Sequence, residues 1–277
     1  MKKFSIIIPS WKNIVLLDLV YKGLKRNSAM EHEIIVFFNE YGEEEKKWAA
    51  GKAVISNSSP ANLGVCAAVN RAAKLATTDY ICYMNDDMYP LPGWDMSLQP
   101  YLELSDKIWI SSTPVEPGKA NPCAIGFCDY GTSPQNFRED DLLRDYRKLK
   151  RPYNMFSTWT PSVIPKSNWE AIGGFDENYF PGFGSDPDLA MKMYNYGCTL
   201  FIGVGTSLVY HFARKTVSRY DDRELIDAKA FFRKKWGISR RRFLDNILYR
   251  GKVITPGLLK KICRKHRLGR FGCSPCP

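Results

Sequence analysis

The run Phe4-Ser5-Ile6-Ile7-Ile8-Pro9 near the amino terminus is short, apolar and ended by proline. A strand of this composition, with no polar alternation, is typical of a parallel sheet that is covered on both faces. Residues 33–38 form a second apolar run, and these two runs are separated by apolar residues at helical spacing. These helical residues are Leu16, Leu17, Val20 and Leu24. The three segments therefore predict a β-α-β unit and a parallel sheet.

The remaining chain continues the alternation of strands and helices, apart from an indistinct region at residues 111–161 that is rich in Pro, Gly, Asn and charged residues. Further strands are expected at residues 54–56, 80–84, 199–204 and 207–210, and further helices at 40–52, 65–76, 166–172 and 187–196. The sequence therefore predicts an α/β fold whose mixed, mainly parallel sheet is flanked by helices.

The 277 residues allow one large domain or one domain with an appendage. Hydrophobic residues make up 44% and charged residues 25%, which is ordinary globular composition. The net charge of +11 is concentrated near the carboxyl terminus, because residues 229–270 contain 15 Lys or Arg and a single acid, Asp245. We therefore expect a catalytic domain at residues 1–220 and a basic, mainly helical appendage at residues 221–277.

The amino-terminal apolar run is too short for the hydrophobic region of a signal peptide, and no run approaches the roughly 18 apolar residues of a membrane-spanning helix. The expected location is cytoplasmic, with contact at the inner face of a membrane as an option. Most of the eight cysteines are expected to stay reduced there. Cys273 and Cys276 form a C-x-x-C motif, but the chain has no second pair with this spacing to complete a zinc site.

Asn85-Asp86-Asp87 follows the predicted strand at residues 80–84. In open α/β sheets ligands bind beyond the carboxyl ends of the strands, so acids at this position are candidates for a site. Adjacent carboxylates repel each other unless a cation or hydrogen-bond donors compensate them. Mg²⁺ or Mn²⁺ would suit, because these ions prefer oxygen ligands and take much of their coordination shell from phosphates and water. Alternatively, the two aspartates begin a turn before Pro90, since aspartate is common in turns.

Asp186 and Asp188 lie in a second candidate segment, Gly182-Phe183-Gly184-Ser185-Asp186-Pro187-Asp188-Leu189. Proline after Ser or Asp is an ordinary start of a helix, so Asp186 could simply cap one. A carboxylate in a glycine-flanked loop could also accept the proton of a hydroxyl as a general base. His211 follows the apolar residues 208–210, and a lone histidine is more often a packed residue than a metal ligand.

Several segments occur in an order that is similar to one known family. They are the opening run through Trp11, Asn62-Leu63-Gly64 with Asn70-Arg71, residues 80–87 with Pro90 and Gly93-Trp94, Gly173-Gly174-Phe175-Asp176-Glu177, Asp186-Pro187-Asp188-Leu189, and His211. Together, over about residues 4–215, they resemble family-2 glycosyltransferases with the GT-A fold. The resemblance implies a Rossmann-like nucleotide-diphospho-sugar transferase domain.

The resemblance also implies a role for each motif. Asp87 would meet a cation, Mn²⁺ or Mg²⁺, and His211 would be the second metal ligand. Asp186 would be the general base, with Asp188 as the substitute candidate because the register of this loop could slip. The mechanism would invert the anomeric centre. The acceptor would be a glycan or a lipid-linked molecule.

The donor would be a nucleoside-diphosphate sugar, held in a pocket at the carboxyl ends of the first strands. Asn85 stands where the family's D-x-D motif often has its first aspartate, and Phe38 stands where many relatives have an acid that binds the base, so Asn39 or Glu40 would substitute for that acid. The residues implied for this pocket are Pro9, Ser10, Trp11, Asn39, Asn62, Arg71, Asn85 and Asp86.

The basic carboxyl-terminal segment has three interpretations: a solvated charged face, contact with anionic lipids, or binding of nucleic acid. We favour the membrane contact, because Leu258, Leu259 and Ile262 alternate with basic residues. A nucleic-acid-binding protein would leave the acids at residues 85–87 and 186–188 unexplained. A nucleotidyltransferase would normally open with a glycine-rich loop, and residues 9–13 contain no glycine. An inactive, glycosyltransferase-like binding module remains a further alternative.

Overall fold

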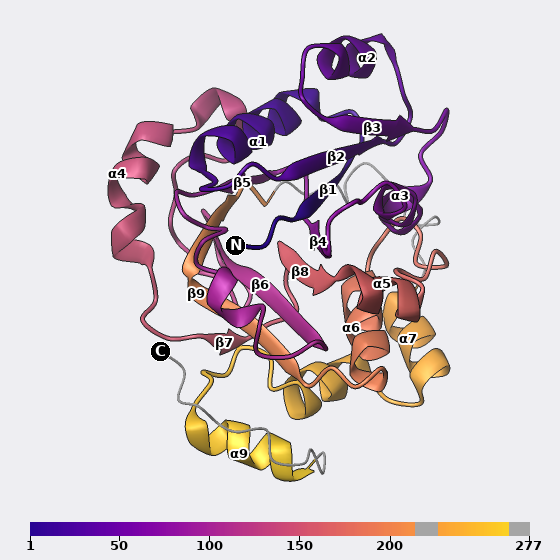
Figure 1. The fold of residues 1–277 in the computed structure, drawn as a ribbon, viewed down its shortest axis with the longest axis vertical. Coiled ribbons are helices and arrows are strands. Elements are labelled where there is room, and N and C mark those ends of the chain that lie inside the picture. Colours follow the sequence, from indigo (N-terminus) through magenta and orange to yellow (C-terminus); the bar gives the residue numbers. More distant parts are fainter. Residues whose placement is uncertain (214–226, 266–277) are drawn as a thin grey trace.

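The computed structural model describes residues 1–213 and 227–265 and contains a nine-stranded sheet within them. The strands lie in the order β3-β2-β1-β4-β8-β6-β9-β5, and β7 pairs with β9 beside this path (Figure 1). The longest ladders, between β6 and β9 and between β1 and β2, are parallel. The expected α/β fold with a mixed, mainly parallel sheet flanked by helices is therefore confirmed.

The amino-terminal half of the sheet is a continuous parallel ladder. Ser10 at the end of β1 lies opposite Phe38 of β2, which in turn lies opposite Ser58 of β3. Because these strands and β4 run the same way, their carboxyl ends meet at one edge of the sheet. The elements are β1 Ser5–Ser10, α1 Ile14–Asn27, β2 Glu33–Phe38, α2 Glu43–Ala50, β3 Ile55–Ser58, α3 Gly64–Ala73 and β4 Tyr80–Tyr83.

The second half of the sheet is mixed. β8 runs antiparallel to both β4 and β6, and β5 runs antiparallel to the end of β9. Two strands were expected at residues 199–210, whereas one long strand is present, with a register shift opposite the step from Ser112 to Thr113. The elements are β5 Met88–Pro90, β6 Ile108–Val115, α4 Glu139–Leu149, β7 Met155–Phe156, β8 Ser162–Pro165, α5 Lys166–Ile172, α6 Ser185–Asn195 and β9 Leu200–His211, with short 3-10 turns at Gln99–Tyr101 and Pro134–Asn136.

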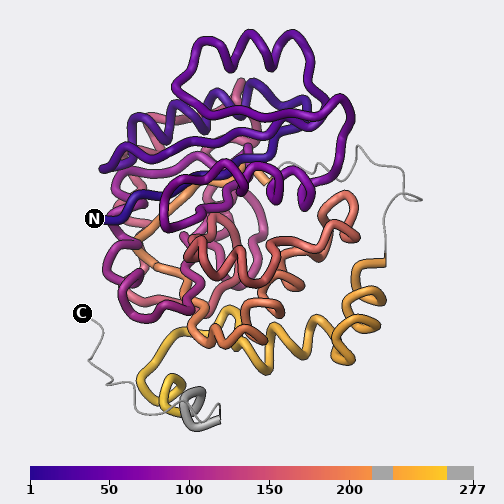
Figure 2. The backbone as a smooth tube through the Cα atoms, turned by 45° about the vertical axis from the view of Figure 1, so that its right-hand side comes forward, coloured from indigo at the N-terminus to yellow at the C-terminus, as the bar shows by residue number. Residues whose placement is uncertain are grey.

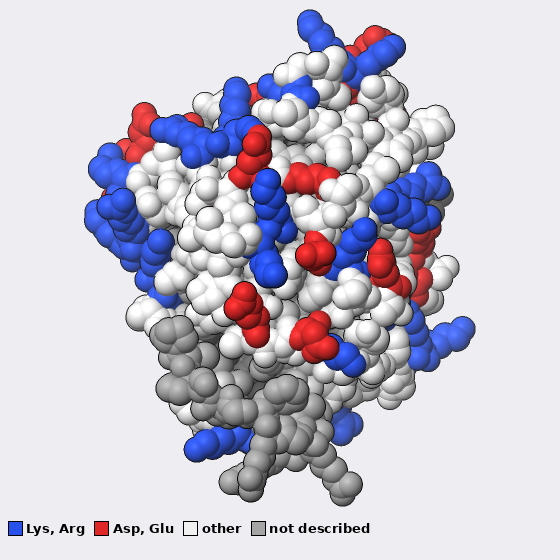
Figure 3. All heavy atoms as spheres, in the orientation of Figure 1, with Lys and Arg blue, Asp and Glu red and all other residues white. Residues whose placement is uncertain are grey.

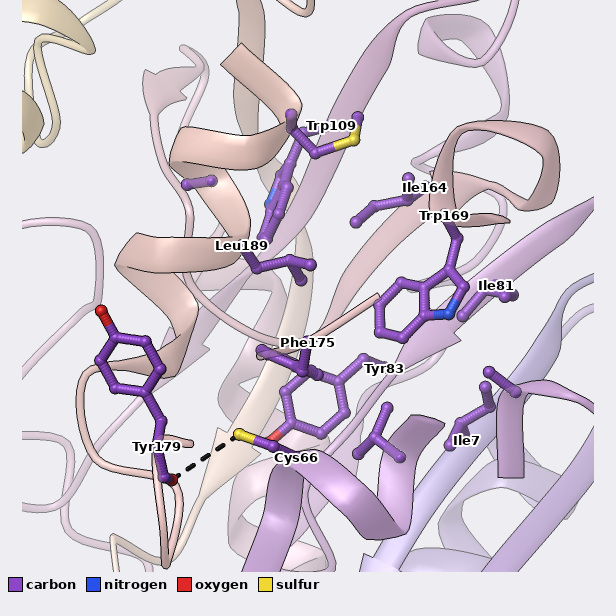
Figure 4. Close-up of a cluster of buried hydrophobic side chains, with 14 of the residues drawn as sticks. Ile7, Cys66, Ile81, Tyr83, Trp109, Ile164, Trp169, Phe175, Tyr179 and Leu189 are labelled. Atoms are coloured by element: carbon purple, nitrogen blue, oxygen red, sulfur yellow. Dashed lines mark hydrogen bonds between the residues drawn. The ribbon is translucent and has the colours of Figure 1, made fainter. Parts of the chain in front are cut away.

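The two faces of the sheet have separate cores, as the period of two along a strand requires. Ile6 and Ile8 of β1 pack with α1 and α2, whereas Ile7 packs with α3, α5 and α6. Figure 4 shows part of the second core, where Tyr83 and Phe175 meet edge to face. Burial on both faces explains why the opening run has no polar alternation.

The carboxyl-terminal segment packs on the core that contains Ile7. Phe232, Phe243 and Leu244 are buried in this cluster, and both views place α7 beside α6 (Figures 1 and 2). The elements are α7 Ala228–Trp236, α8 Arg240–Arg242, the π-helical turn η5 Phe243–Ile247 and α9 Pro256–Lys265. The domain boundary expected at residue 220 and the pair Cys273 and Cys276 lie outside the described residues. Among the helices that are described, none has both the length and the apolar character to cross a membrane.

Candidate active site

Polar side chains gather where the parallel strands β1, β2 and β4 end. Asn85-Asp86-Asp87 follows β4 directly, and the Ser10 Oγ at the end of β1 donates a hydrogen bond of 2.7 Å to Asp86 Oδ2. Asp87 is buried, whereas Asn85 and Asp86 are only partly buried. The segment that the sequence identified by position alone thus lies in contact with the opening strand.

Asp87 and His211 are brought together by strand pairing. β5 begins at Met88, which lies opposite His211 at the end of β9, and Phe212 N donates to Asp87 O at 3.1 Å. His211 Nε2 is 3.4 Å from Asp87 Oδ2. On its other side His211 Nδ1 is 2.9 Å from Glu116 Oε1. The imidazole therefore lies between two carboxylates, one after β4 and one after β6.

The electrostatics of this group follow from its burial. Burial lowers the pKa of His211, but the neighbouring carboxylates of Asp87 and Glu116 outweigh burial and raise the pKa to about 10. The imidazole thus contacts two buried carboxylates at once. Because a histidine must be neutral to bind a metal ion, binding of a cation here would release this proton.

The possible metal ligands at this position suit a hard divalent cation that also binds phosphate oxygens. Within the residues described, no three side chains of His, Cys, Asp or Glu are grouped to hold an ion by themselves. Asp87 and His211 offer one carboxylate and one imidazole, which suffices for an ion that completes its shell with substrate oxygens and water. Glu116 would fix the ring through Nδ1, as carboxylates commonly do behind a metal-bound histidine.

Asp186 lies in the first turn of α6, at the end of a glycine-rich loop. The N-cap of the helix is Gly184, with φ of 81°, and no side chain caps this helix. Asp186 therefore does not act as the N-cap that one interpretation of the sequence suggested. Burial raises the pKa of Asp186 to about 6. A carboxylate with a pKa near 6 can hold a proton transiently near neutral pH, as a general base must.

Asp188, the substitute candidate, is bound on all sides. It is completely buried, and its two oxygens accept hydrogen bonds from Lys235 Nζ at 2.9 Å, Trp236 Nε1 at 2.6 Å and the Tyr179 hydroxyl at 3.2 Å. Lys235 also contacts Asp176 at 2.6 Å. Lys235 and Trp236 belong to the basic carboxyl-terminal helix α7, whereas Tyr179 lies in the segment before α6. The geometry therefore favours Asp186 over Asp188 for contact with a substrate.

Tyr83 links the segment after β4 to the loop before α6. Its hydroxyl is buried, and burial together with the negative charges of Asp186, Asp86 and Asp87 raises its pKa well above the usual value. The charges of all three carboxylates thus act on one tyrosine, although they come from segments about a hundred residues apart. In Figure 4, Tyr83 lies beside Cys66 in the same cluster.

The predicted pocket for a nucleotide base lies at the ends of β1 and β2. The Trp11 indole donates to Glu40 Oε2 at 2.9 Å, and Lys12 Nζ is 2.6 Å from Glu40 Oε1. Lys12 and Glu40 both have positive φ, at 49° and 65°, which is uncommon for such residues. Glu40, rather than the aromatic side chain of Phe38, thus provides the acidic group beside Trp11.

Asn39 has a different surrounding from Glu40. It is buried, its Oδ1 accepts from Leu63 N at 3.1 Å, and its amide donates to Gly64 O at 3.4 Å. Asn62 Oδ1 in turn accepts from Gly64 N at 2.9 Å. The next residue, Val65, donates from its backbone to Pro181 O at 2.8 Å. A chain of short contacts therefore joins the end of β2, the start of α3 and the loop that precedes Asp186.

Two of the predicted pocket residues have different positions. Pro9 is buried within β1, opposite Phe37. Arg71 is exposed in the last turn of α3, two turns from the helix start at Gly64. Among the described residues, Arg71 makes no hydrogen bond or ion pair to the other candidate residues. The fold thus brings most of the pocket residues together but leaves Arg71 apart.

Three residues that contact or face the candidate site residues could not be identified from the sequence: Glu116, Tyr83 and Lys235. Glu116 follows β6, but the region after residue 111 has no clear periodicity, so the strand end was not recognisable. Tyr83 belongs to the predicted strand at residues 80–84, but the sequence does not show which face of the sheet it occupies. Lys235 lies in the basic segment, where no sequence pattern distinguishes it from the other cations. Each needs a contact with a distant element to reveal its place.

Comparisons with known proteins concern the family and the fold of the chain. A sequence profile described as Glycosyl transferase family 2 matches residues 5–154. No curated protein sequence gives a significant match. Among solved structures, GalNAc-T7 with UDP, GalNAc and Mn²⁺ is similar, with a TM-score of 0.58, 13% identity, and coverage of 96% of this chain and 55% of that chain.

Two further structures have the same architecture. The mannosyltransferase PcManGT from Pyrobaculum calidifontis, in complex with GDP-Man and Mn²⁺, has a TM-score of 0.55 and 14% identity over 97% of this chain and 70% of its own. TarS from S. aureus has a TM-score of 0.54 and 10% identity, over 97% of this chain and 44% of its own. The chain thus spans about half the length of GalNAc-T7 and of TarS. At these identities the likeness shows a shared fold.

Proposed function

Because the chain belongs to glycosyl transferase family 2, we propose that it transfers a sugar from a nucleoside-diphosphate sugar to a hydroxyl group of a glycan or lipid-linked acceptor. The main support is the arrangement around Tyr83, where the partly buried Asp186 lies near the acids that follow β4. The proposed base and the acids after β4 thus act electrostatically on the same buried tyrosine. The similar structures of GalNAc-T7 and PcManGT contain UDP and GDP-Man.

Asp186 is the proposed general base. Its carboxylate accepts the proton of the acceptor hydroxyl while that oxygen forms a bond to the anomeric carbon, and the bond from this carbon to the diphosphate oxygen breaks on the opposite face. The configuration at the anomeric carbon is inverted. The raised pKa of Asp186 suits this role, because a base with a pKa near the working pH accepts the proton more readily.

Asp87 and His211 are the proposed ligands of Mn²⁺ or Mg²⁺, with Glu116 holding the imidazole. When bound, such an ion neutralises the charge that develops on the diphosphate leaving group. Asp86 and Ser10 orient the segment after β4 through their hydrogen bond. Trp11 offers a ring on which a nucleotide base can stack, and Glu40 fixes the orientation of that ring.

The first experiment is binding of UDP, GDP and dTDP by isothermal titration, each with and without Mn²⁺. Wild type should bind one nucleotide in a Mn²⁺-dependent manner, and Asp87→Ala should lose this binding. Asp79→Ala is the matched control, because this exposed acid precedes the same strand at its other end. Failure of all three nucleotides to bind would contradict the proposal and favour a binding module without activity.

We also propose that α9 brings the protein to an anionic membrane that holds the acceptor. Leu258 and Leu259 are half-buried on this helix, and Lys260 is exposed. Flotation with vesicles that contain anionic lipid should recover the protein at low salt and release it at high salt, because screening weakens attraction to the surface. Absence of binding at low salt would rule out this contact.

A further inference from the structure

A basic pocket lies between α7 and α8, apart from the residues described above. Its volume is about 360 Å³, and its lining contains four cationic side chains and no carboxylate. The lining residues are Lys229, Ala230, Arg233, Ser239, Arg240 and Arg241. In Figure 3, basic side chains project at the lower right edge, over the position that α7 has in Figure 1.

Among the residues that the structure describes, one of the four cationic side chains of this pocket lies close to a carboxylate. Arg241 is 3.6 Å from Asp245, but within residues 1–213 and 227–265 no carboxylate pairs with Lys229, Arg233 or Arg240. Asp227, the acid at the start of α7, accepts hydrogen bonds from the backbone of the helix. Like charges this close repel each other unless an anion lies between them.

The two walls of the pocket are fixed to the core. Phe232 anchors α7 in the buried cluster, and Lys235 and Trp236 bind Asp188 of α6. Phe243, which follows α8, is buried in the same cluster. Because the backbone on both sides is held, the points from which the cationic side chains extend are fixed, and only the side-chain rotamers must be ordered when a ligand binds.

The pocket adjoins the loop of the proposed base. A Cβ atom at Gly184 would lie 2.7 Å from Ala228 Cβ and 3.4 Å from Arg240 Nη1. Gly184 precedes Asp186 by two residues, and its φ of 81° is one that glycine adopts readily. Arg240 therefore lines the pocket on one side and contacts the base loop on the other.

We propose that this pocket binds a phosphate group carried by the acceptor, so that the acceptor hydroxyl is presented to Asp186. Guanidinium groups match the oxygens of phosphate in a bidentate geometry. A phosphate group, which can carry more than one negative charge, therefore suits a cluster of several cations better than a carboxylate with one charge would. The inference rests on the proposed function, because it takes Asp186 as the base. It adds the chemical class of the acceptor.

Binding of inorganic pyrophosphate tests the pocket directly. The titrations are done at low ionic strength and with EDTA, which removes divalent cations and so suppresses metal-dependent binding at the proposed donor site. They compare wild type with the double variant Arg233→Ala/Arg240→Ala and with Lys234→Ala. Lys234 is a matched control, because it is an exposed charge on the same helix outside the pocket. We expect the double variant to bind about tenfold or more weakly and the control to change less than about twofold.

Three outcomes would overturn the inference. Equal losses in the double variant and in Lys234→Ala would mean that the charge acts diffusely. Unchanged binding in the double variant would place the phosphate elsewhere. If the double variant loses binding to phosphatidylserine vesicles but still binds pyrophosphate as wild type does, the pocket contacts a membrane surface instead.

Hydrolysis of the nucleotide sugar, with water as the acceptor, separates this inference from the proposed function. The single variant Arg233→Ala should retain the rate of wild type within about twofold, because Arg233, unlike Arg240, is not the residue that contacts the base loop. If wild type hydrolyses no nucleotide sugar, the proposed function fails. The pocket can then no longer be an acceptor site, even if it binds pyrophosphate. If hydrolysis is normal and pyrophosphate does not bind, the inference alone fails.

Discussion

At the scale of single residues, Asp186 combines a chemical role with a cost in stability. Burial favours its neutral form and raises its pKa from the ordinary value of 3.8 for aspartate to about 6 in the folded protein. Between these two values the folded state binds more protons than the unfolded chain, and stability therefore falls as the pH rises from about 4 to 6. Above pH 6 the ionised carboxylate is a net cost.

Asp186→Asn should therefore abolish transfer and increase stability. We expect activity to fall by about 10²–10⁴-fold, and the free energy of unfolding at pH 8 to rise by up to about 3 kcal/mol relative to wild type. At pH 4 the two proteins should be nearly equally stable. Urea denaturation at both pH values measures the difference, with Asp79→Asn as the control. A variant less stable than wild type at pH 8 would contradict the prediction.

The same carboxylate predicts a pH dependence of activity. Because only ionised Asp186 can accept a proton, kcat/KM of wild type should rise with pH through about 6 and then level off. A profile at saturating Mn²⁺, measured at constant ionic strength, tests this. A constant rate between pH 5 and 8 would exclude Asp186 as the base.

Glu116 acts through His211 in our proposal, so its loss should affect metal affinity. Glu116→Gln keeps the size of the side chain but removes the charge behind the imidazole. We expect binding of Mn²⁺ in the presence of UDP to weaken by about 10-fold or more, as for other groups behind a metal-bound histidine. Titration followed by electron paramagnetic resonance measures this. The control is Glu103→Gln, which changes an exposed acid before β6. An equal loss of Mn²⁺ affinity in this control would contradict the role of Glu116.

At the scale of elements, α7 holds α6 and the base loop in place. Lys235 bridges Asp176 and Asp188, and its removal would take away the ammonium group that lies 2.9 Å from the buried Asp188. Lys235→Met should lower the free energy of unfolding by roughly 2–3 kcal/mol, less than for a fully buried pair because Lys235 is partly exposed. Lys234→Met should change it by less than about 0.5 kcal/mol. Equal effects of the two changes, measured by denaturation, would contradict a specific role of Lys235.

Elements also explain what could be read from the sequence. Apolar runs such as Phe4 to Pro9 predicted the strands, because burial on both faces leaves a continuous signal. The acids after β4 were found because a strand end is visible in sequence. Glu116 could not be identified as a site residue from the sequence. It meets His211 only because β6 pairs with β9, and pairing between distant strands leaves no local sequence pattern.

At the scale of the whole molecule, the buried cluster on one face of the sheet includes side chains from both ends of the chain. Ile7 and Phe232 belong to the same cluster. Phe232→Ala should therefore destabilise the entire fold by about 3–5 kcal/mol, and unfolding should remain a single transition. Far-ultraviolet circular dichroism and tryptophan fluorescence should report the same midpoint. Two separate transitions, with only one shifted by the substitution, would instead support an independent unit after residue 220.

The pairing of β5 with β9 has a consequence for stiffness. Asp87 and His211 are attached to neighbouring points of one hydrogen-bonded ladder, whereas Asp186 follows a loop that contains Gly182 and Gly184. A ladder deforms less easily than such a loop. In the proposed reaction the leaving group would thus be held on a rigid frame, and any adjustment to acceptors of different shape would be made by the more deformable loop that precedes Asp186.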